Sequence, residues 1–395
     1  MTTLTPEPKA RPRPAPHLSD AQVAELAAEL DALRSEVLAK RGGEDAAYIR
    51  RVIATQRWLE VGSRTVLLFS GFRPAWWLGT FGLAVAKILE NMEIGHNVMH
   101  GQWDWMRDPD IHSSTWEWDH ASPAAQWKYS HNHLHHTYTN VIDRDNDLGY
   151  GIMRVSEDQP WELFHLGQPL WNLVNAAIFE YSIAAYDLEL GPYLKGESTK
   201  STEEFKAEAR AVLEKIKRQA TKDYVIHPIM SGPNILHTLS ANLVANLIRN
   251  VWSHSVIICG HFPEGVETFE TDSIEGETRG EWYLRQMTGS ANISGSPLLH
   301  LMTGNLSHQI EHHLFPDLPS SRYAEVAPRI REIMDRYQLR YVTGPMPRQV
   351  ASVTKKIFAL ALPNRDPKRS RFGQIADAVR DTVASVRAAR TRRRA

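Results

Sequence analysis

The sequence predicts an all-α protein that crosses a membrane several times. Long apolar stretches alternate with polar segments, and the strongest of them, from Pro228 to Ile248, holds no Asp, Glu, Lys or Arg. The 12 Trp residues suit a protein with boundaries between apolar and aqueous surroundings, where indole rings are enriched. A soluble all-helical protein with buried helices is the alternative, because several apolar stretches are interrupted.

Two segments precede the apolar part of the chain. Residues 1–17 are rich in Pro, Lys and Arg without an apolar run, so we expect a disordered arm and no signal peptide. Residues 18–50 form an amphipathic N-terminal helix region. Its helical periodicity over 18–40 begins at a capping Ser19 or Asp20 and predicts a surface helix.

The apolar part, residues 51–345, holds about four predicted membrane helices. Two of them, at 52–72 and 75–100, are separated at Arg73-Pro74, because proline disfavours helix in the residue before it. Each is near the roughly 20 residues needed to cross hydrocarbon. The others are predicted at 161–186 and at 228–263, where Arg249 is the single charged residue.

Residues 346–395 form a basic C-terminal tail. Arginines are frequent from Asn364 onward, and the chain ends in TRRRA. Such a tail could lie on an anionic cytoplasmic leaflet, where each basic residue contributes about 1 kcal/mol, or it could be solvated. The sequence leaves both possibilities open.

Charge and cysteine content exclude several classes of protein. The formal net charge of −1 argues against a general nucleic-acid binder. The single cysteine, Cys259, excludes an internal disulfide and a cysteine-rich zinc or iron–sulfur site. Any metal site must therefore use His, Asn, Gln and carboxylates.

Half of the 18 histidines lie in three short windows. The windows read HNVMH at 96–100, HNHLHH at 131–136 and HQIEHH at 308–313. Residues four apart on a helix share a face, so each window presents two or three imidazoles toward one point. Adjacent histidines are unfavourable in a core and in a membrane, so the two His-His pairs indicate function.

The three windows predict more than one bound metal ion. Neutral imidazole is a common ligand of iron, zinc and copper. Zinc sites use three or four ligands, and eight or more imidazoles exceed that number. Three clusters can surround two ions, and two irons that share histidines could bind and split O2.

The uncharged helix at 228–263 offers further candidates. Asn250, His254 and His261 follow one another at spacings of four and seven, on one helical face. A histidine inside a membrane helix indicates a functional site, although a helix cap or an interhelical hydrogen bond is the alternative. We favour a ligand role for His254 over His261, which lies beside Gly260 and Pro263 where the helix should end.

The windows resemble the histidine boxes of the integral-membrane fatty acid desaturases. HNVMH matches the first box, HxxxH, and HNHLHHTYTN matches the longer form of the second, HNxxHH. HQIEHHLFP matches the third box, in the branch that replaces the leading His by Gln. NVWSH at 250–254 resembles the family's additional Asn-x-x-x-His segment, and the resemblance covers roughly residues 50–345.

The resemblance implies a fold and a set of ligands. The fold would be about four transmembrane helices with a cytosolic helical cap that holds a di-iron site, in a multi-pass protein of the bacterial cytoplasmic membrane with its active site facing the cytosol. No catalytic residue separate from the metal ligands is expected. Three residues are possible additions, namely His308, Gln309 and Asn250, and His133 is extra to the box pattern. The implied ligands are His96, His100, His131, His135, His136, His254, His312 and His313.

The resemblance also implies the reaction and its partners. Two ferrous ions would activate O2 with two external electrons, and two hydrogens removed from a fatty acyl chain would leave a cis double bond and water. The substrate would be linked to CoA, ACP or a membrane lipid. The sequence has no haem-binding HPGG segment and no dinucleotide fingerprint, so electrons are expected from NAD(P)H through a separate reductase and a ferredoxin-like carrier.

Three aspartates after the second window, Asp143, Asp145 and Asp147, could orient ligating histidines, and a polar turn explains them equally well. Two other functions remain open. The closest is a related di-iron hydroxylase or epoxidase of lipids or hydrocarbons. A protein of another class would bind or transport metal in the membrane without catalysis.

Overall fold

The computed structural model describes residues 13–145 and 147–392, with side chains through residue 384. These residues are mainly helical, and they add one pair of short parallel strands, β1 (Asn292–Ser294) and β2 (Thr343–Pro345). The predicted all-α class is therefore confirmed.

The α-helices are α1 (Asp20–Ala39), α2 (Gly43–Leu67), α3 (Arg73–Leu89), α4 (Asn97–Met99), α5 (Ala124–Trp127), α6 (His136–Tyr138), α7 (Gln168–Ala177), α8 (Phe179–Asp187), α9 (Leu190–Lys195), α10 (Thr202–Thr221), α11 (His227–Met230), α12 (Ile235–His261), α13 (Arg279–Thr288), α14 (Pro297–Met302), α15 (Gln309–Leu314), α16 (Tyr323–Arg336), α17 (Met346–Leu360) and α18 (Arg371–Arg392). The π-helical segments are η1 (Glu90–His96), η3 (Lys128–His135) and η6 (Lys222–Ile226). The 3₁₀ turns are η2 (Asp104–Met106), η4 (Gly149–Gly151), η5 (Leu163–Gly167), η7 (Gly232–Asn234), η8 (Thr271–Ile274) and η9 (Ser320–Arg322).

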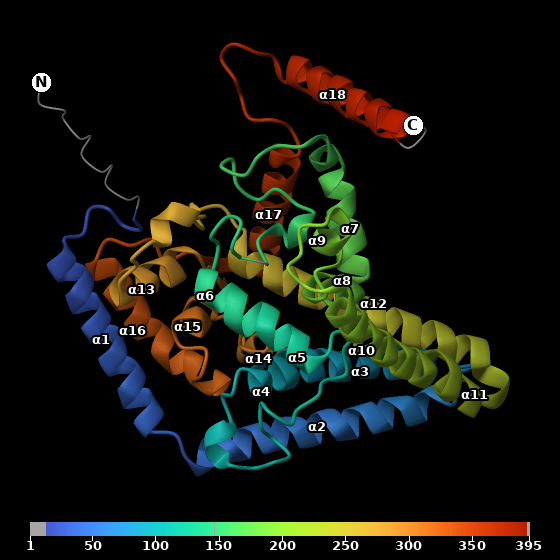
Figure 1. The fold of residues 1–395 in the computed structure, drawn as a ribbon. Helices are drawn as coiled ribbons and strands as arrows, with labels where there is room; N and C mark the ends of the chain where they lie inside the picture. Colours follow the sequence, from blue (N-terminus) through green and yellow to red (C-terminus); the bar gives the residue numbers. More distant parts are fainter. Residues whose placement is uncertain (1–12, 146, 393–395) are drawn as a thin grey trace, which may run out of the picture.

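Two long helical hairpins form one side of the molecule (Figure 1). The first is α2 with α3, and in the second α10 continues through η6 and α11 before the chain returns in α12. The turns of both hairpins lie together, because Nδ2 of Asn234 donates to the backbone oxygen of Leu68 at 2.9 Å. Inside the first hairpin a Cβ at Gly79 would lie 2.6 Å from Cγ of Leu67, so only glycine allows this close approach.

The helix breaks agree in part with the sequence prediction. The first hairpin turns at residues 68–72, directly before Pro74, which stands in the first turn of α3. The segment predicted at 161–186 is divided into α7 and α8 at Ile178, whose backbone is not helical. In the last segment the turn at Gly232 delays the long helix until Ile235.

The turns of the hairpins expose large apolar side chains. Phe69 and Phe72 of the first turn and Ile229, Met230 and Leu236 of the second are each at least 60% exposed. Within the described part of the chain, none of the helices combines the length and the apolar character of a membrane-crossing segment.

A cap of helices packs at the other end of the hairpins. In α1 the side chain of Ser19 caps the helix in a box with Gln22, and its apolar face packs against α13 and α16. Leu26, Leu30 and Ile330 are fully buried in this core. The cap includes α15, which carries the third histidine window.

The chain ends depart from the predicted tails. Residues 1–12 of the predicted arm lie outside the described residues, whereas Nε2 of His17 lies 3.0 Å from the backbone oxygen of Tyr337. The region predicted as a basic tail begins with α17, which packs on α7 and α12 and buries Val353 and Ile357. The composition of this region is basic, and three charged residues fall within α17. Its apolar residues nevertheless recur at helical spacing, which indicates an amphipathic helix. The prediction used the composition and not this spacing.

Charged side chains hold the two hairpins together in the interior. Asp223 of η6 accepts from Lys87 of α3 at 2.7 Å and from Arg64 of α2 at 2.9 Å. Asp223 and Lys87 are less than 5% exposed. One carboxylate thus neutralises two cations from the other hairpin.

We expect Asp223→Asn to destabilise the protein strongly, by about 3–5 kcal/mol, because two cations would lose their buried partner. The thermal unfolding midpoint of the purified protein measures this effect. Asp110→Asn, at an exposed position, is the matched control and should leave the midpoint unchanged. A similar midpoint for both variants would contradict this role of Asp223.

Candidate metal centre

The first two histidine windows lie on π-helical turns. The window HNVMH begins at the end of η1, and HNHLHH begins inside η3. A π turn is wider than an α turn, with i→i+5 hydrogen bonds, and is frequent at functional sites. In η3 it brings both His135 and His136 to the side of His131, with ring centroids 5.0 Å from His131 in each case.

The structure brings eight histidines together in the interior. The possible ligand atoms of the first group lie within 4.8 Å of one another, and those of the second group do so as well. His136 lies between the groups, with its ring 4.7 Å from that of His100 and 4.4 Å from that of His313. The first group is His96, His100, His131 and His312, and the second is His135, His261 and His313.

The nitrogen atoms at the centre fit bound metal. Nε2 of five of these histidines is buried and has no hydrogen-bond partner among the described residues, and such buried polar atoms require an explanation. Burial, aided by the neighbouring imidazoles, lowers the pKa of His136, His312 and His313 well below the ordinary value. Neutral rings with free lone pairs are what a metal ion binds. The five are His100, His135, His136, His312 and His313.

The opposite nitrogen of several rings is held by a polar side chain. Nδ1 of His135 lies 2.8 Å from Asp145, and Nδ1 of His131 lies 3.0 Å from Asp147. Burial opposes a charge on His135, but the carboxylates of Asp145 and Asp147 raise its pKa above the ordinary value. Such partners fix the orientation of metal-binding rings.

The third window is held in the same way from the cap. Nδ1 of His312 lies 3.2 Å from the hydroxyl of Tyr323, and Nδ1 of His313 lies 3.0 Å from Oε1 of Gln286. No local sequence pattern points to Tyr323 or Gln286, because the histidines that they contact lie on another helix. Asp143, the third predicted aspartate, is exposed.

His261 joins the centre, whereas His254 does not. The ring of His261 lies 4.7 Å from that of His135 and 4.8 Å from that of His313. His254 lies against Phe179, and its Nε2 is buried without a partner among the described residues. The ligand role predicted for His254 therefore has no support from this arrangement and stays a prediction.

The other predicted additions lie around the centre. Nε2 of Gln309 lies 2.9 Å from Nε2 of His261, and a Cβ at Gly260 would lie 2.9 Å from Cγ of Gln309. The ring of His308 instead lies 4.6 Å from that of His300.

Asn250 lines an interior cavity with His96 and His131, whereas His133 lies on the surface. Nδ2 of Asn250 donates to the backbone oxygen of Ala177 at 2.9 Å and thereby holds the break between α7 and α8. His133 is exposed on the outer face of η3, where its ring contacts that of Tyr129.

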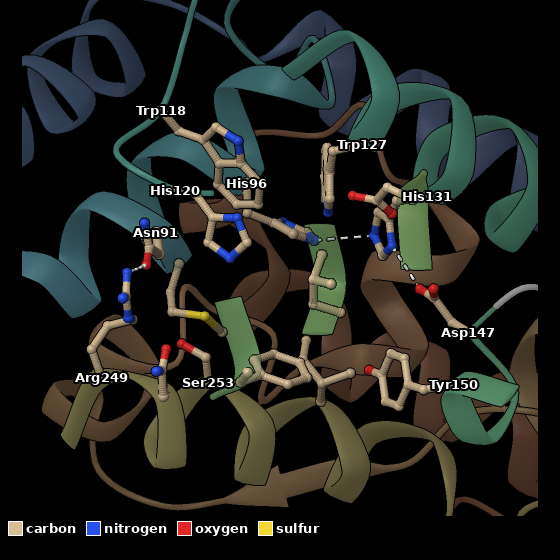
Figure 2. A pocket seen from close by; sticks show the side chains of 16 residues that line it. Asn91, His96, Trp118, His120, Trp127, His131, Asp147, Tyr150, Arg249 and Ser253 are labelled. Carbon is tan, nitrogen blue, oxygen red and sulfur yellow. Dashed lines mark hydrogen bonds and ion pairs between the residues drawn. The ribbon is translucent and has the colours of Figure 1, made fainter. Parts of the chain in front are cut away.

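A cavity adjoins the first group of histidines (Figure 2). His96 and His131 form part of its wall, and their Nε2 atoms lie 3.2 Å apart. Trp118, Trp127 and Phe179 supply much of the apolar lining. A narrow apolar space beside a metal centre suits an extended hydrocarbon chain.

Comparison with known proteins identifies the family. A family model described as fatty acid desaturase matches residues 74–345. This chain belongs to that family. The desaturase is 51% identical over 353 residues to the NADPH-dependent stearoyl-CoA 9-desaturase of Mycobacterium tuberculosis, an alignment that covers 88% of this chain and 82% of the relative. It is 25% identical over 305 residues to the sn-1 linoleoyl-lipid 6-desaturase of Synechocystis sp., covering 75% and 83% of the two chains.

No solved structure matches the chain. The family expected from the histidine windows is thus confirmed, and the desaturase is an oxidoreductase that acts on fatty acyl chains. The family implies iron, O2 and reducing equivalents, and the donors at the centre, which are imidazoles without thiolates, are compatible with iron.

We expect Asp145→Asn to weaken iron binding by roughly 10- to 100-fold, because the carboxylate that orients His135 would lose its charge. Iron retained during titration with a chelator measures the affinity. Asp143→Asn, in the same loop but exposed, should bind iron as the unchanged protein does. Equal affinities of the two variants would show that Asp145 has no orienting role.

A second pair of variants tests which histidine of α12 binds iron. His261→Ala should lose iron, because its ring faces two other histidines of the centre, and His254→Ala should retain it. Iron per folded chain, measured by elemental analysis after gel filtration, distinguishes the two. The reverse result would support the ligand that the family resemblance implies.

Proposed function

We propose that this desaturase inserts a cis double bond into a saturated acyl chain carried by CoA. The observation that carries this proposal is the cavity with apolar walls that reaches His96 and His131. The relative from Mycobacterium tuberculosis, whose printed name specifies stearoyl-CoA and position 9, supports an acyl-CoA substrate and a double bond near the middle of the chain.

We further propose that eight histidines hold two irons. Seven of them are those expected from the three windows, and His261 takes the place that the resemblance gave to His254. The support is the mutual proximity of these rings and the unpartnered Nε2 atoms between them. Asp145, Asp147, Gln286 and Tyr323 would orient the ligands through the opposite nitrogen.

Bound iron would supply the activation of O2 and the removal of hydrogen from an unactivated CH2 group. The chain's own residues would position that CH2 group. The ring of Trp127 stacks on that of His131 with centroids 4.5 Å apart, so the wall of the cavity and the metal centre are one packed unit. Trp118 and Phe179 extend the apolar wall and would exclude water beside the histidines.

The same proposal includes a membrane location. The exposed apolar residues at the two hairpin turns, among them Phe69, Phe72 and Met230, lie on one side of the molecule and would enter the lipid. The metal centre lies at the opposite ends of the hairpin helices and would face the cytosol. Electrons would come from NADPH through a separate reductase, directly or by a ferredoxin-like carrier, since the relative's name includes NADPH and the single cysteine cannot hold an iron–sulfur cluster.

Expression in a host that lacks this activity tests the function. Gas chromatography of the host's fatty acids, with location of the double bond, should show a new mid-chain cis-unsaturated product. His312→Ala should abolish the product because it removes a proposed ligand, whereas His308→Ala should retain it, since the His308 ring faces His300.

Other products would contradict the proposal. Hydroxylated or epoxidised product alone would indicate the related oxygenase reaction. Iron-loaded protein that leaves the host's lipids unchanged, when supplied with a reductase, would favour a metal-binding protein without catalysis.

A further inference from the structure

One end of the cavity beside the histidines is closed by polar side chains (Figure 2). Asn91 comes from η1, His120 from the segment before α5, and Arg249 from α12. Their exposed fractions are 4%, 5% and 2%, so this end has no opening to solvent. The rest of the lining also has polar members, namely His96, His131, Asp147, Asp187, Asn250 and Ser253, although most of its surface is apolar.

The three polar groups are held by one another and by neighbouring residues. Nη1 of Arg249 donates to Oδ1 of Asn91 at 2.7 Å, and the guanidinium also forms an ion pair with the buried Glu180. Nδ1 of His120 accepts from the backbone N–H of Ser122 at 3.1 Å, which leaves the proton on Nε2. The His120 ring stacks on that of Trp118, with centroids 4.1 Å apart.

An acyl chain meets this wall after an apolar passage. Met92 and Phe179 are among the apolar side chains that line the same cavity. A methyl group gains free energy by contact with these residues. Beyond them it would have to separate Arg249 from Asn91 or cover Nε2 of His120, and buried polar groups that lose their partners are destabilised.

The burial of the wall also decides which end of the substrate can reach it. CoA is a large, charged nucleotide that must stay in water, and residues of at most 5% exposure leave it no room. Ile183, Ile257 and Asp147 also line the cavity, and they are partly exposed. The free methyl end is therefore the end that approaches Asn91, His120 and Arg249.

We propose that Asn91, His120 and Arg249 form a polar stop that limits the length of the acyl chain beyond the reacting carbons. This inference rests on the proposed acyl-CoA desaturase function. In that function, the three residues would determine the chain-length specificity. A chain that ends at the stop is accepted, and a chain that is one or two CH2 groups longer is rejected. In a closed pocket one excess CH2 group changes specificity by roughly tenfold or more.

Substitutions at His120 test the stop in both directions. The full-length holoenzyme with its electron donor is given a mixture of saturated acyl-CoA substrates that differ by two carbons, from myristoyl to behenoyl. Relative kcat/KM values come from the ratios of unsaturated products. The first rejected chain is the shortest substrate that the wild-type protein discriminates against. His120→Ala should bring the kcat/KM for this chain to within about fourfold of that for the preferred chain. This factor corresponds to the contribution of one buried CH2 group. His120→Trp should shift the preference toward shorter chains.

A matched histidine in the same segment is the control. His112 is partly exposed and lies outside the cavity, so His112→Ala should keep the wild-type preference. Asn91→Ala provides a second variant if His120→Ala fails to fold, with the same expected direction. Unchanged preferences in the folded cavity variants would overturn the polar stop. Wild-type protein that makes no unsaturated acyl chain would instead refute the proposed function on which the stop rests.

Discussion

Eight imidazole rings occupy one space in the interior, with neighbouring ring centroids 4.4 to 5.5 Å apart. Five of the rings have a buried Nε2 without a partner among the described residues. Protons on all eight rings would bring like charges together, which burial opposes. Burial favours neutral rings at His136, His312 and His313, and each ring needs a partner that fixes its orientation. The second nitrogens therefore need partners, and Asp145, Gln286 and Tyr323 come from three different parts of the chain to supply them. Much of the cap serves this arrangement.

Two buried carboxylates connect the histidine windows to the rest of the fold. Glu93, one turn before His96, accepts from the hydroxyls of Tyr48 and Ser320 and from Nδ2 of Asn305. Glu311 accepts from Asn292 at 2.7 Å and from Tyr341 at 2.9 Å, and burial raises its pKa to about 7. Each carboxylate joins a window to elements that are remote in sequence. The position of the histidines thus depends on the packing of the whole cap against the hairpins.

The sequence could predict which histidines share a window but not where along a helix the centre lies. Spacings of four and five residues were enough for His131, His135 and His136, because that information is local. On α12, helical periodicity places His254 and His261 on related faces, yet they lie about 10 Å apart along the axis. Which of them lies beside the other histidines depends on how α12 packs against η3 and α15, and in the structure it is His261. No sequence motif marks His120, because it is a lone histidine in a polar segment. Its role depends on the cavity that forms around it in the folded protein.

The cavity has two features that could set where the double bond forms, and they act from opposite ends of the substrate. In the proposed function, His96 and His131 would lie beside the reacting carbons, and the polar wall at Asn91 and Arg249 belongs to the same cavity. If the methyl end pressed on the wall, every substrate would react at a constant number of carbons from that end. If the CoA carrier anchors the chain at the surface, the bond is counted from the carboxyl end, and the wall acts only on chains that are too long. Binding of a nucleotide carrier involves many polar groups, whereas contact of one methyl group contributes little, so the carrier should dominate. The wall then selects chain length, and the carrier and the histidines together select the bond.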